Sequence, residues 1–219
     1  MSLRGSLRTI RRQLIPFTTT NRIVSIGGVG STSLVTHLEN GDEDRVWGHT
    51  RHLHCLEPEF LPEVRKGLEV KACFVFGDPF PSVQSVFRRG LQKRHERSIT
   101  RYIEGYKPRL RRDTTLQEYL QENVDRFFLS RQLENWVGYQ GTRVKIMAVK
   151  YEALAEHVQE IMGFLGCDRP FKVRPRTRRY DDQPAEIQVG LERLYGEVRT
   201  RIESLPSLIR INADRRSPE

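Results

Sequence analysis

A glycine-rich loop leads directly into hydroxyl residues near the start of the chain. Its residues are Gly27, Gly28, Val29, Gly30, Ser31, Thr32 and Ser33. Glycine lets the backbone turn sharply and lets a ligand approach the main chain closely. A helix that starts after such a loop attracts an anion through its free N–H groups and its dipole. The loop is therefore a candidate phosphate or sulfate site. A turn without a ligand is the alternative, because no lysine follows Gly30 and the Walker pattern is not met.

Three of the six histidines lie within six residues, at His49, His52 and His54. Histidine is the side chain best suited to transferring protons near neutral pH. A metal site is the weaker interpretation, because no carboxylate or cysteine stands at regular ligand spacing beside them. The cluster is thus either a proton-transfer site or a solvated loop without chemistry.

A second strand-loop-helix unit follows further along the chain. The apolar run at 70–76 precedes Pro79, which cannot continue a strand but suits the first turn of a helix. The helix that follows carries one hydroxyl, Ser85, and two cations, Arg88 and Arg89. This unit is a second candidate anion site.

Alternating strands and helices must position these side chains. Short apolar runs rich in β-branched residues predict strands at 23–26, 45–49, 70–76 and 143–150. Helices are predicted at 34–38, 58–66, 82–89, 158–165 and 186–205, with two more inside 114–138 that break near Phe128. The basic segment 93–112 has few apolar residues and is expected to be a surface excursion. The βα alternation predicts an α/β fold.

The composition favours an anionic partner. The 219 residues carry a net charge of +9, with 37% hydrophobic and 30% charged residues, which suits a buried core under a highly charged surface. A nucleotide cofactor, a sulfated or phosphorylated substrate, nucleic acid and a membrane surface all match this charge. The cysteines, Cys55, Cys73 and Cys167, are far apart and odd in number. A disulfide framework or structural zinc site is therefore not expected, and a reducing compartment fits best.

Residues 1–21 are expected to form a basic amphipathic helix or arm. The first 20 residues contain four arginines and no acidic residue, with apolar residues at helical spacing. An organellar transit peptide has the same composition, so the expected cytoplasmic location has an organellar alternative. No apolar run approaches the roughly 20 residues of a membrane span.

Three regions, taken in order, resemble the sulfotransferase superfamily, whose members transfer a sulfuryl group from 3′-phosphoadenosine 5′-phosphosulfate (PAPS) to a hydroxyl or amine. The loop 27–33 resembles the family's 5′-phosphosulfate loop. Residues 76–85 resemble its 3′-phosphate motif, an Asp-Pro pair followed six residues later by serine. Trp136, then 149–154 (Val-Lys-Tyr-Glu-Ala-Leu), then 164–166 (Phe-Leu-Gly) resemble a third series.

The resemblance implies a three-layer α/β sandwich with a short, mainly parallel sheet and flanking helices, P-loop-like, with the ligand at the carboxyl ends of the strands. It implies one sulfotransferase-like domain at 22–205, after the arm 1–21 and before a C-terminal tail at 206–219.

The resemblance also implies PAPS as cofactor, PAP as product, and no metal. The implied general bases are His49 and His52. The implied cofactor-binding residues are Gly28, Val29, Gly30, Ser31, Thr32, Ser33, Asp78, Ser85, Arg88, Arg89, Arg176 and Arg178. Two positions depart from the family pattern, because Gly28 and Gly77 stand where it usually has a cation.

The expected function is sulfuryl transfer to an acceptor, either a small molecule or a glycan. A catalytically degenerate domain that binds a nucleotide, nucleic acid or an acidic glycan is the first alternative, with nucleic acid the less favoured partner. A P-loop kinase is the second, and it lacks the lysine that such an enzyme needs after Gly30.

Overall fold

Strands and helices alternate along the chain, as predicted for an α/β protein. The computed structural model describes residues 20–39, 53–167, 170–173 and 183–213. The strands are β1 (Thr20–Ser25), β2 (Val70–Phe76), β3 (Val144–Lys150) and β4 (Leu208–Ile211). The α-helices are α2 (Thr32–Glu39), α3 (Pro79–Arg88), α4 (Gln92–Ile99), α5 (Leu116–Glu122), α6 (Leu129–Val137), α7 (Val158–Phe164) and α8 (Ala185–Ser204). The predicted strand 45–49 and residues 1–19 of the predicted arm lie outside the described residues.

The strands form one sheet in the order β1-β2-β3-β4. β1, β2 and β3 run parallel, so their carboxyl ends lie at one edge, whereas β4 is antiparallel to β3. Leu53 adds a parallel bridge to Val24 of β1, through backbone hydrogen bonds to Ile23 and Ser25. These bonds use the edge of β1 that faces away from β2, so β1 has a parallel neighbour on each side. In open α/β sheets, ligands bind outside the carboxyl ends at such a point.

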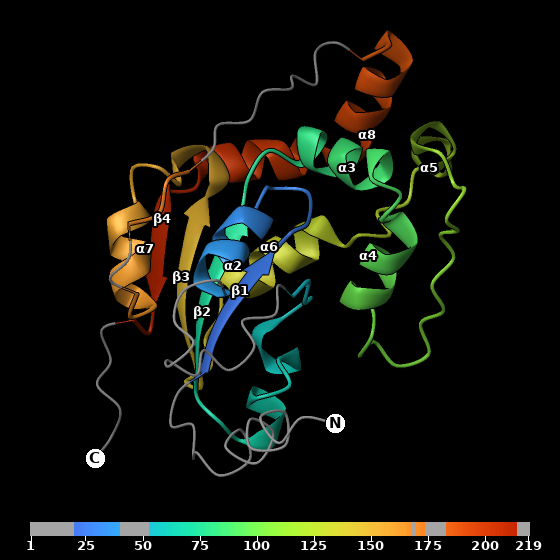
Figure 1. Ribbon diagram of the computed structural model, residues 1–219. Coiled ribbons are helices and arrows are strands. Elements are labelled where there is room, and N and C mark those ends of the chain that lie inside the picture. The colour runs from blue at the N-terminus through green and yellow to red at the C-terminus, as the bar shows by residue number, and fades with distance from the viewer. Residues whose placement is uncertain (1–19, 40–52, 168–169, 174–182, 214–219) are drawn as a thin grey trace, which may run out of the picture.

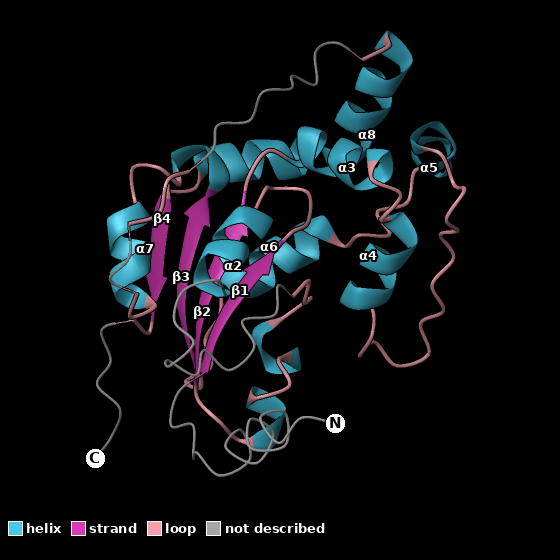
Figure 2. Ribbon diagram, viewed as in Figure 1, coloured by secondary structure: helices cyan, strands magenta, loops and turns pink. Residues whose placement is uncertain are grey.

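Helices cover both faces of the sheet. Figure 1 shows α2 in front of the strands and α6 behind them, and Figure 2 shows the strands enclosed between helices. On α6 the buried ring of Trp136 stacks on Phe74 of β2, with 5.0 Å between the ring centroids. On α2 the side chains of Leu34 and Leu38 are fully buried. The result is an α/β sandwich with a mainly parallel sheet, which confirms this part of the predicted fold class.

The prediction that 93–112 is a surface excursion is wrong at its start, where α4 packs into the domain. The buried residues of α4 are Gln92, His95, Glu96 and Ile99. Most of them are polar, and polar groups are buried when they have hydrogen-bond partners. Gln92, for example, donates from Nε2 to the carbonyl oxygen of Thr114 at 2.9 Å. A search for apolar periodicity does not detect a helix whose inner face is polar.

Two boundaries and one element type also differ from the predictions. The sheet begins at Thr20, inside the predicted arm, and β4 lies within the predicted tail 206–219. The predicted helix 58–66 is instead a pair of short 3₁₀ turns, η1 (Pro58–Phe60) and η2 (Val64–Lys66). A third such turn, η3 (Tyr151–Ala153), follows β3 directly.

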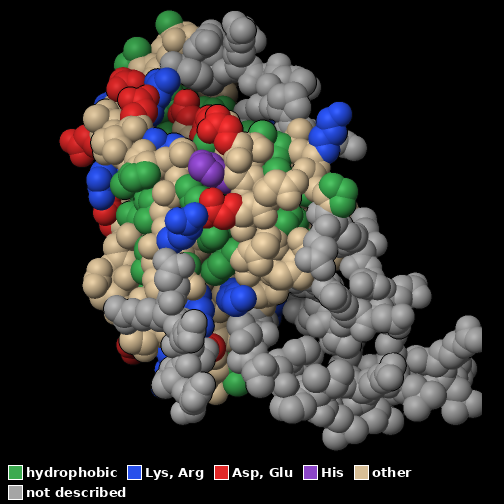
Figure 3. All heavy atoms as spheres, turned by 90° about the vertical axis from the view of Figure 1, so that its left-hand side faces the viewer, with side chains coloured by type: hydrophobic (Ala, Val, Ile, Leu, Met, Phe, Trp, Pro, Cys, Tyr) green, Lys and Arg blue, Asp and Glu red, His purple; other side chains and the backbone are tan. Residues whose placement is uncertain are grey.

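Charges of both signs mix on the face formed by α7 and β4. Figure 3 shows acidic and basic side chains side by side there. Arg210 of β4 forms an ion pair with Glu160 of α7, and Lys150 donates to the carbonyl oxygen of Glu203 at 3.1 Å. None of the helices in the described ranges is both long enough and apolar enough to cross a membrane.

Candidate functional site

The glycine loop after β1 packs against the segments that follow β2 and β3. A Cβ atom placed on Gly28 would lie 2.1 Å from the carbonyl oxygen of Ser82 in α3. A Cβ atom placed on Gly30 would lie 2.8 Å from the ring of Tyr151, which follows β3. Both glycines also have a positive φ, +68° and +79°, which strains residues with a side chain. The loop is rich in glycine because three chain segments meet there.

Glu152, in the segment after β3, contacts the segment after β2. Its Oε1 atom accepts a hydrogen bond from the backbone N–H of Asp78 at 3.3 Å. A Cβ atom placed on Gly77 would lie 2.8 Å from its Oε2 atom. A side chain at position 77 would have to displace this carboxylate, which is the far end of a flexible side chain.

The hydroxyl groups of the glycine loop face in different directions. Ser25 Oγ accepts hydrogen bonds from the backbone N–H of Gly27 at 3.3 Å and from Ser31 Oγ at 3.0 Å. Ser31 is only 2% exposed, so its hydroxyl holds the loop from inside. Thr32 is exposed and Ser33 is half-buried at the start of α2. The Ser33 hydroxyl donates to the carbonyl oxygen of Gly30 at 3.1 Å, so the exposed hydroxyl of Thr32 is the one accessible to an anion.

His54 lies beside the carboxyl end of β1. Its Nδ1 atom is 2.9 Å from the carbonyl oxygen of Ser25. A carbonyl only accepts, so Nδ1 carries the proton and Nε2 is the basic nitrogen. Burial is the main reason that the pKa of His54 is lowered to about 4; the positive charges of Arg89 and Arg94 act in the same direction, and the bond to Ser25 opposes them. The imidazole is therefore neutral at physiological pH.

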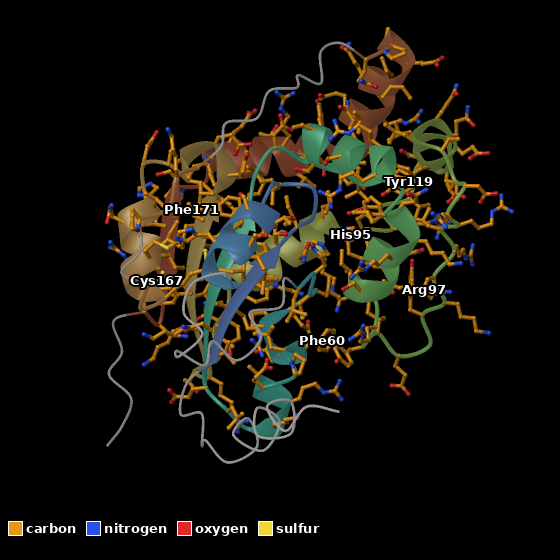
Figure 4. The ribbon with its side chains drawn as sticks, viewed as in Figure 1. Phe60, His95, Arg97, Tyr119, Cys167 and Phe171 are labelled. Carbon is orange, nitrogen blue, oxygen red and sulfur yellow. The ribbon has the colours of Figure 1, made fainter. Side chains whose placement is uncertain are left out.

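His95 of α4 supports the glycine loop from behind. Its ring packs edge-on against His54, with 4.3 Å between the centroids, and also against Phe127 at 4.8 Å. A Cβ atom placed on Gly27 would lie 2.1 Å from its Cε1 atom. Figure 4 shows His95 on the side of α4 that faces the sheet, whereas Arg97 points to the other side. α4 thus fixes the position of the loop.

Asp78 at the start of α3 is engaged inside the protein. Its Oδ1 atom caps the helix by accepting the backbone N–H of Phe80 at 2.9 Å, and its Oδ2 atom lies 3.7 Å from Nη2 of Arg199 in α8. The guanidinium of Arg199 lies 4.7 Å from the centroid of the Phe80 ring. The carboxylate predicted to contact a cofactor therefore stabilises α3 and ties it to α8.

The structure places the remaining predicted residues as follows. Val29 is buried, Ser85 is half-buried on α3, and Arg88 and Arg89 are exposed at its end. His49, His52, Arg176 and Arg178 lie outside the described residues.

Sequence reasoning missed several residues of this site. His54 was part of the histidine cluster but was not selected as a base. The apolar residue Leu53 beside it, which bridges to β1, could have indicated that this end of the cluster lies against the sheet. His95, Arg94 and Arg199 lie far along the chain from the glycine loop, and their spacing gave no signal.

No protein family model matches the chain, and no similar protein was found among curated proteins or solved structures. Among the described residues, no three histidine, cysteine, aspartate or glutamate side chains gather closely enough to hold a metal ion.

Proposed function

We propose that the chain is a PAPS-dependent sulfotransferase with a P-loop-like fold, which transfers a sulfuryl group to a hydroxyl or amine. The contact of the loops after β1, β2 and β3 carries this proposal. Gly28 meets Ser82, and Gly30 meets Tyr151, so the three segments that resemble the family's motifs adjoin one another. A neutral histidine, His54, lies beside the carboxyl end of β1, and the charges of Arg89 and Arg94 are close enough to lower its pKa.

The residues around the loop fit an anionic nucleotide in part. Thr32 is exposed at the first turn of α2, where helical N–H groups lack intrahelical acceptors. Arg89 is exposed and close enough to His54 to influence its pKa, so it supplies positive charge beside the loop. Position 28 supplies no cation and has no room for one. Arg89 and Arg94 would therefore take over the neutralisation that a loop lysine performs in the family pattern.

When bound, PAPS would supply the activated sulfuryl group. The N–H groups from Val29 to Thr32, with the Thr32 hydroxyl, would hold its sulfate and 5′-phosphate. Ser85 and Arg89 would hold the 3′-phosphate. Sulfuryl transfer resembles phosphoryl transfer, in which the protein chiefly positions the reactants and stabilises charge.

His54 is the described residue best placed to receive the acceptor proton. The bond from Nδ1 to Ser25 fixes the ring and leaves Nε2 as the basic nitrogen. A pKa of about 4 is low for a general base. An anion bound beside Arg89 and Arg94 would offset their charge and raise that pKa. His49 and His52 remain predictions for the same role.

A degenerate binding domain is the second candidate, and two observations favour it. Gly28 is packed against Ser82, and the Asp78 carboxylate is paired with Arg199. In both contacts, a position that binds cofactor in the family pattern instead packs against another part of this protein. Such a domain would bind PAP without turning over PAPS.

Transfer from sulfur-labelled PAPS to phenol, amine and carbohydrate acceptors tests the proposal. We expect labelled product from the wild type, and about a 100-fold slower rate for His54→Gln, which is the lower end of what a general base contributes. His157→Gln is the matched control, because His157 bonds Ser207 on a different part of the fold, and its rate should not change. Binding of PAP without product from any acceptor would favour the second candidate, whereas neither binding nor product would exclude a PAPS site in this chain.

A further inference from the structure

We propose that the hollow between 105–109 and 124–126 is a binding site for a small anion carried on an apolar body, such as an alkyl or aryl sulfate or carboxylate. The hollow has a volume of about 460 Å³, and its lining residues are Gly105, Tyr106, Lys107, Arg109, Val124 and Arg126. That volume lies within the range of small-molecule sites. This inference goes beyond the proposed function and does not depend on it.

A buried carboxylate holds one wall of the hollow in place. Glu96 of α4 is fully buried and accepts hydrogen bonds from Tyr106 Oη at 2.8 Å and from the backbone N–H groups of Arg109 and Leu110 at 3.0 and 2.7 Å. These bonds satisfy the carboxylate and fix residues 106–110 against α4. The wall is therefore built before a ligand arrives, which lowers the entropy lost on binding.

The lining carries positive charge and no acidic residue. Lys107 and Arg109 are exposed, and neither side chain has an ion-pair partner among the described residues. Arg126 pairs with Glu122, and that carboxylate is not part of the lining. Burial and the bond to Glu96 raise the pKa of Tyr106 to about 12, so its phenol stays neutral. An anion in the hollow thus meets uncompensated cations.

An apolar surface lies beside these cations. Val124 is 48% exposed, one of the few large hydrophobic residues on the described surface. It lies in the turn between α5 and α6, next to Asn123, whose φ is +51°. The ring of Tyr106 is the other apolar element, held edge-on to Phe128 at 5.4 Å. The site therefore suits a ligand whose charged group is joined to a hydrocarbon part.

The hollow is distinct from the glycine-loop site. Two adjacent residues of α4 contact the two regions separately. His95 packs against Gly27 and His54, whereas Glu96 accepts hydrogen bonds from the wall of the hollow. Their side chains leave the helix about 100° apart. A ligand in the hollow should therefore leave the nucleotide site open.

Calorimetric titration with octyl sulfate, below its micelle concentration, tests the site. We expect saturable binding of one equivalent, at least tenfold tighter than that of inorganic sulfate or of octanol. The reason is that only octyl sulfate has both a charged sulfate group and a hydrocarbon chain. The same affinity should be measured with saturating PAP present, which separates this site from the nucleotide site. Equal affinity for octyl sulfate and octanol, or competition with PAP, would overturn the proposal.

Variants locate the site. Lys107→Ala combined with Arg109→Ala should weaken octyl sulfate binding about tenfold, and Val124→Asp should weaken it at least as much by repelling the anion. Arg97→Ala is the matched control, because Arg97 is exposed on α4 and does not line the hollow, and its affinity should stay within twofold. All of these residues are exposed, so we expect the variants to fold, which circular dichroism would verify. Affinity that is unchanged in the double variant, or reduced equally in Arg97→Ala, would show binding by general surface charge and refute the site.

Discussion

Gly28 of the glycine loop lies directly against the carbonyl oxygen of Ser82, the fourth residue of α3. A side chain at position 28 would have to displace backbone, which is far more difficult than displacing a flexible side chain. Glycine at this position is thus required by the way the loop closes on α3. A lysine at position 28 would not fit against this backbone. Gly28→Lys should therefore not increase the affinity of the chain for PAP.

Gly28→Ala should destabilise the fold by about 3 kcal/mol, from the strained positive φ together with the clash. Gly90→Ala is the matched control, because Gly90 also has a positive φ, +64°, but nothing lies within 4 Å of its Cβ position. It should lower the free energy of unfolding by about 1 kcal/mol. Urea denaturation measures both values. Equal losses in the two variants would mean that the contact with Ser82 contributes nothing.

The lowered pKa of His54 predicts a pH dependence of stability. The native pKa is about 4 and the ordinary value is 6.5, so between these pH values the unfolded chain binds a proton that the native protein does not. The neutral form of His54 therefore makes its full contribution to the free energy of unfolding above pH 6.5. Up to about 3 kcal/mol of that free energy is lost as the pH falls from 6.5 to 4.

His54→Gln should flatten the dependence of the free energy of unfolding on pH between 6.5 and 4. His157→Gln should leave it unchanged. In a complementary experiment, NMR titration of the His54 ring should show its pKa rise when PAP binds, because the anion offsets Arg89 and Arg94. A pKa that stays the same, or falls, would argue against an anion beside these arginines.

The carboxylate of Glu96 is predicted to be essential for stability. Glu96→Ala would leave the donors of Tyr106, Arg109 and Leu110 without their acceptor, which costs about 3 kcal/mol in total. Glu104→Ala, which removes an exposed carboxylate from the same loop, should change stability by less than about 0.5 kcal/mol. Denaturation midpoints compare the two, and similar losses would contradict a structural role specific to Glu96.

Local patterns were sufficient to predict most of the core elements. β2 occupies 70–76 as predicted, because a strand buried on both faces is a continuous apolar run. α8 differs by one residue at each end from the predicted 186–205. The break before α6 falls at Phe128, whose φ is +52°. In each case the determining signal lies within the segment itself.

Elements stabilised by distant polar contacts could not be predicted in this way. α4 buries Glu96 because of backbone donors at 109 and 110, and no property of residues 92–99 reveals them. In the site, the glycine loop was recognised from its composition, whereas the pairing of Asp78 with Arg199 joins residues more than 100 positions apart. Such a contact exists only once the fold brings α3 and α8 together.

The proposed nucleotide site, formed by the glycine loop and Arg89, requires a 3′-phosphate on its ligand. Calorimetric titration of the full chain with PAP and with 5′-AMP tests it most directly, using the wild type, Arg89→Ala and the control Arg97→Ala. We predict that PAP binds at least tenfold more tightly than 5′-AMP, that Arg89→Ala weakens PAP binding about tenfold, and that Arg97→Ala leaves it within twofold. Equal affinities for PAP and 5′-AMP in the wild type would contradict the account.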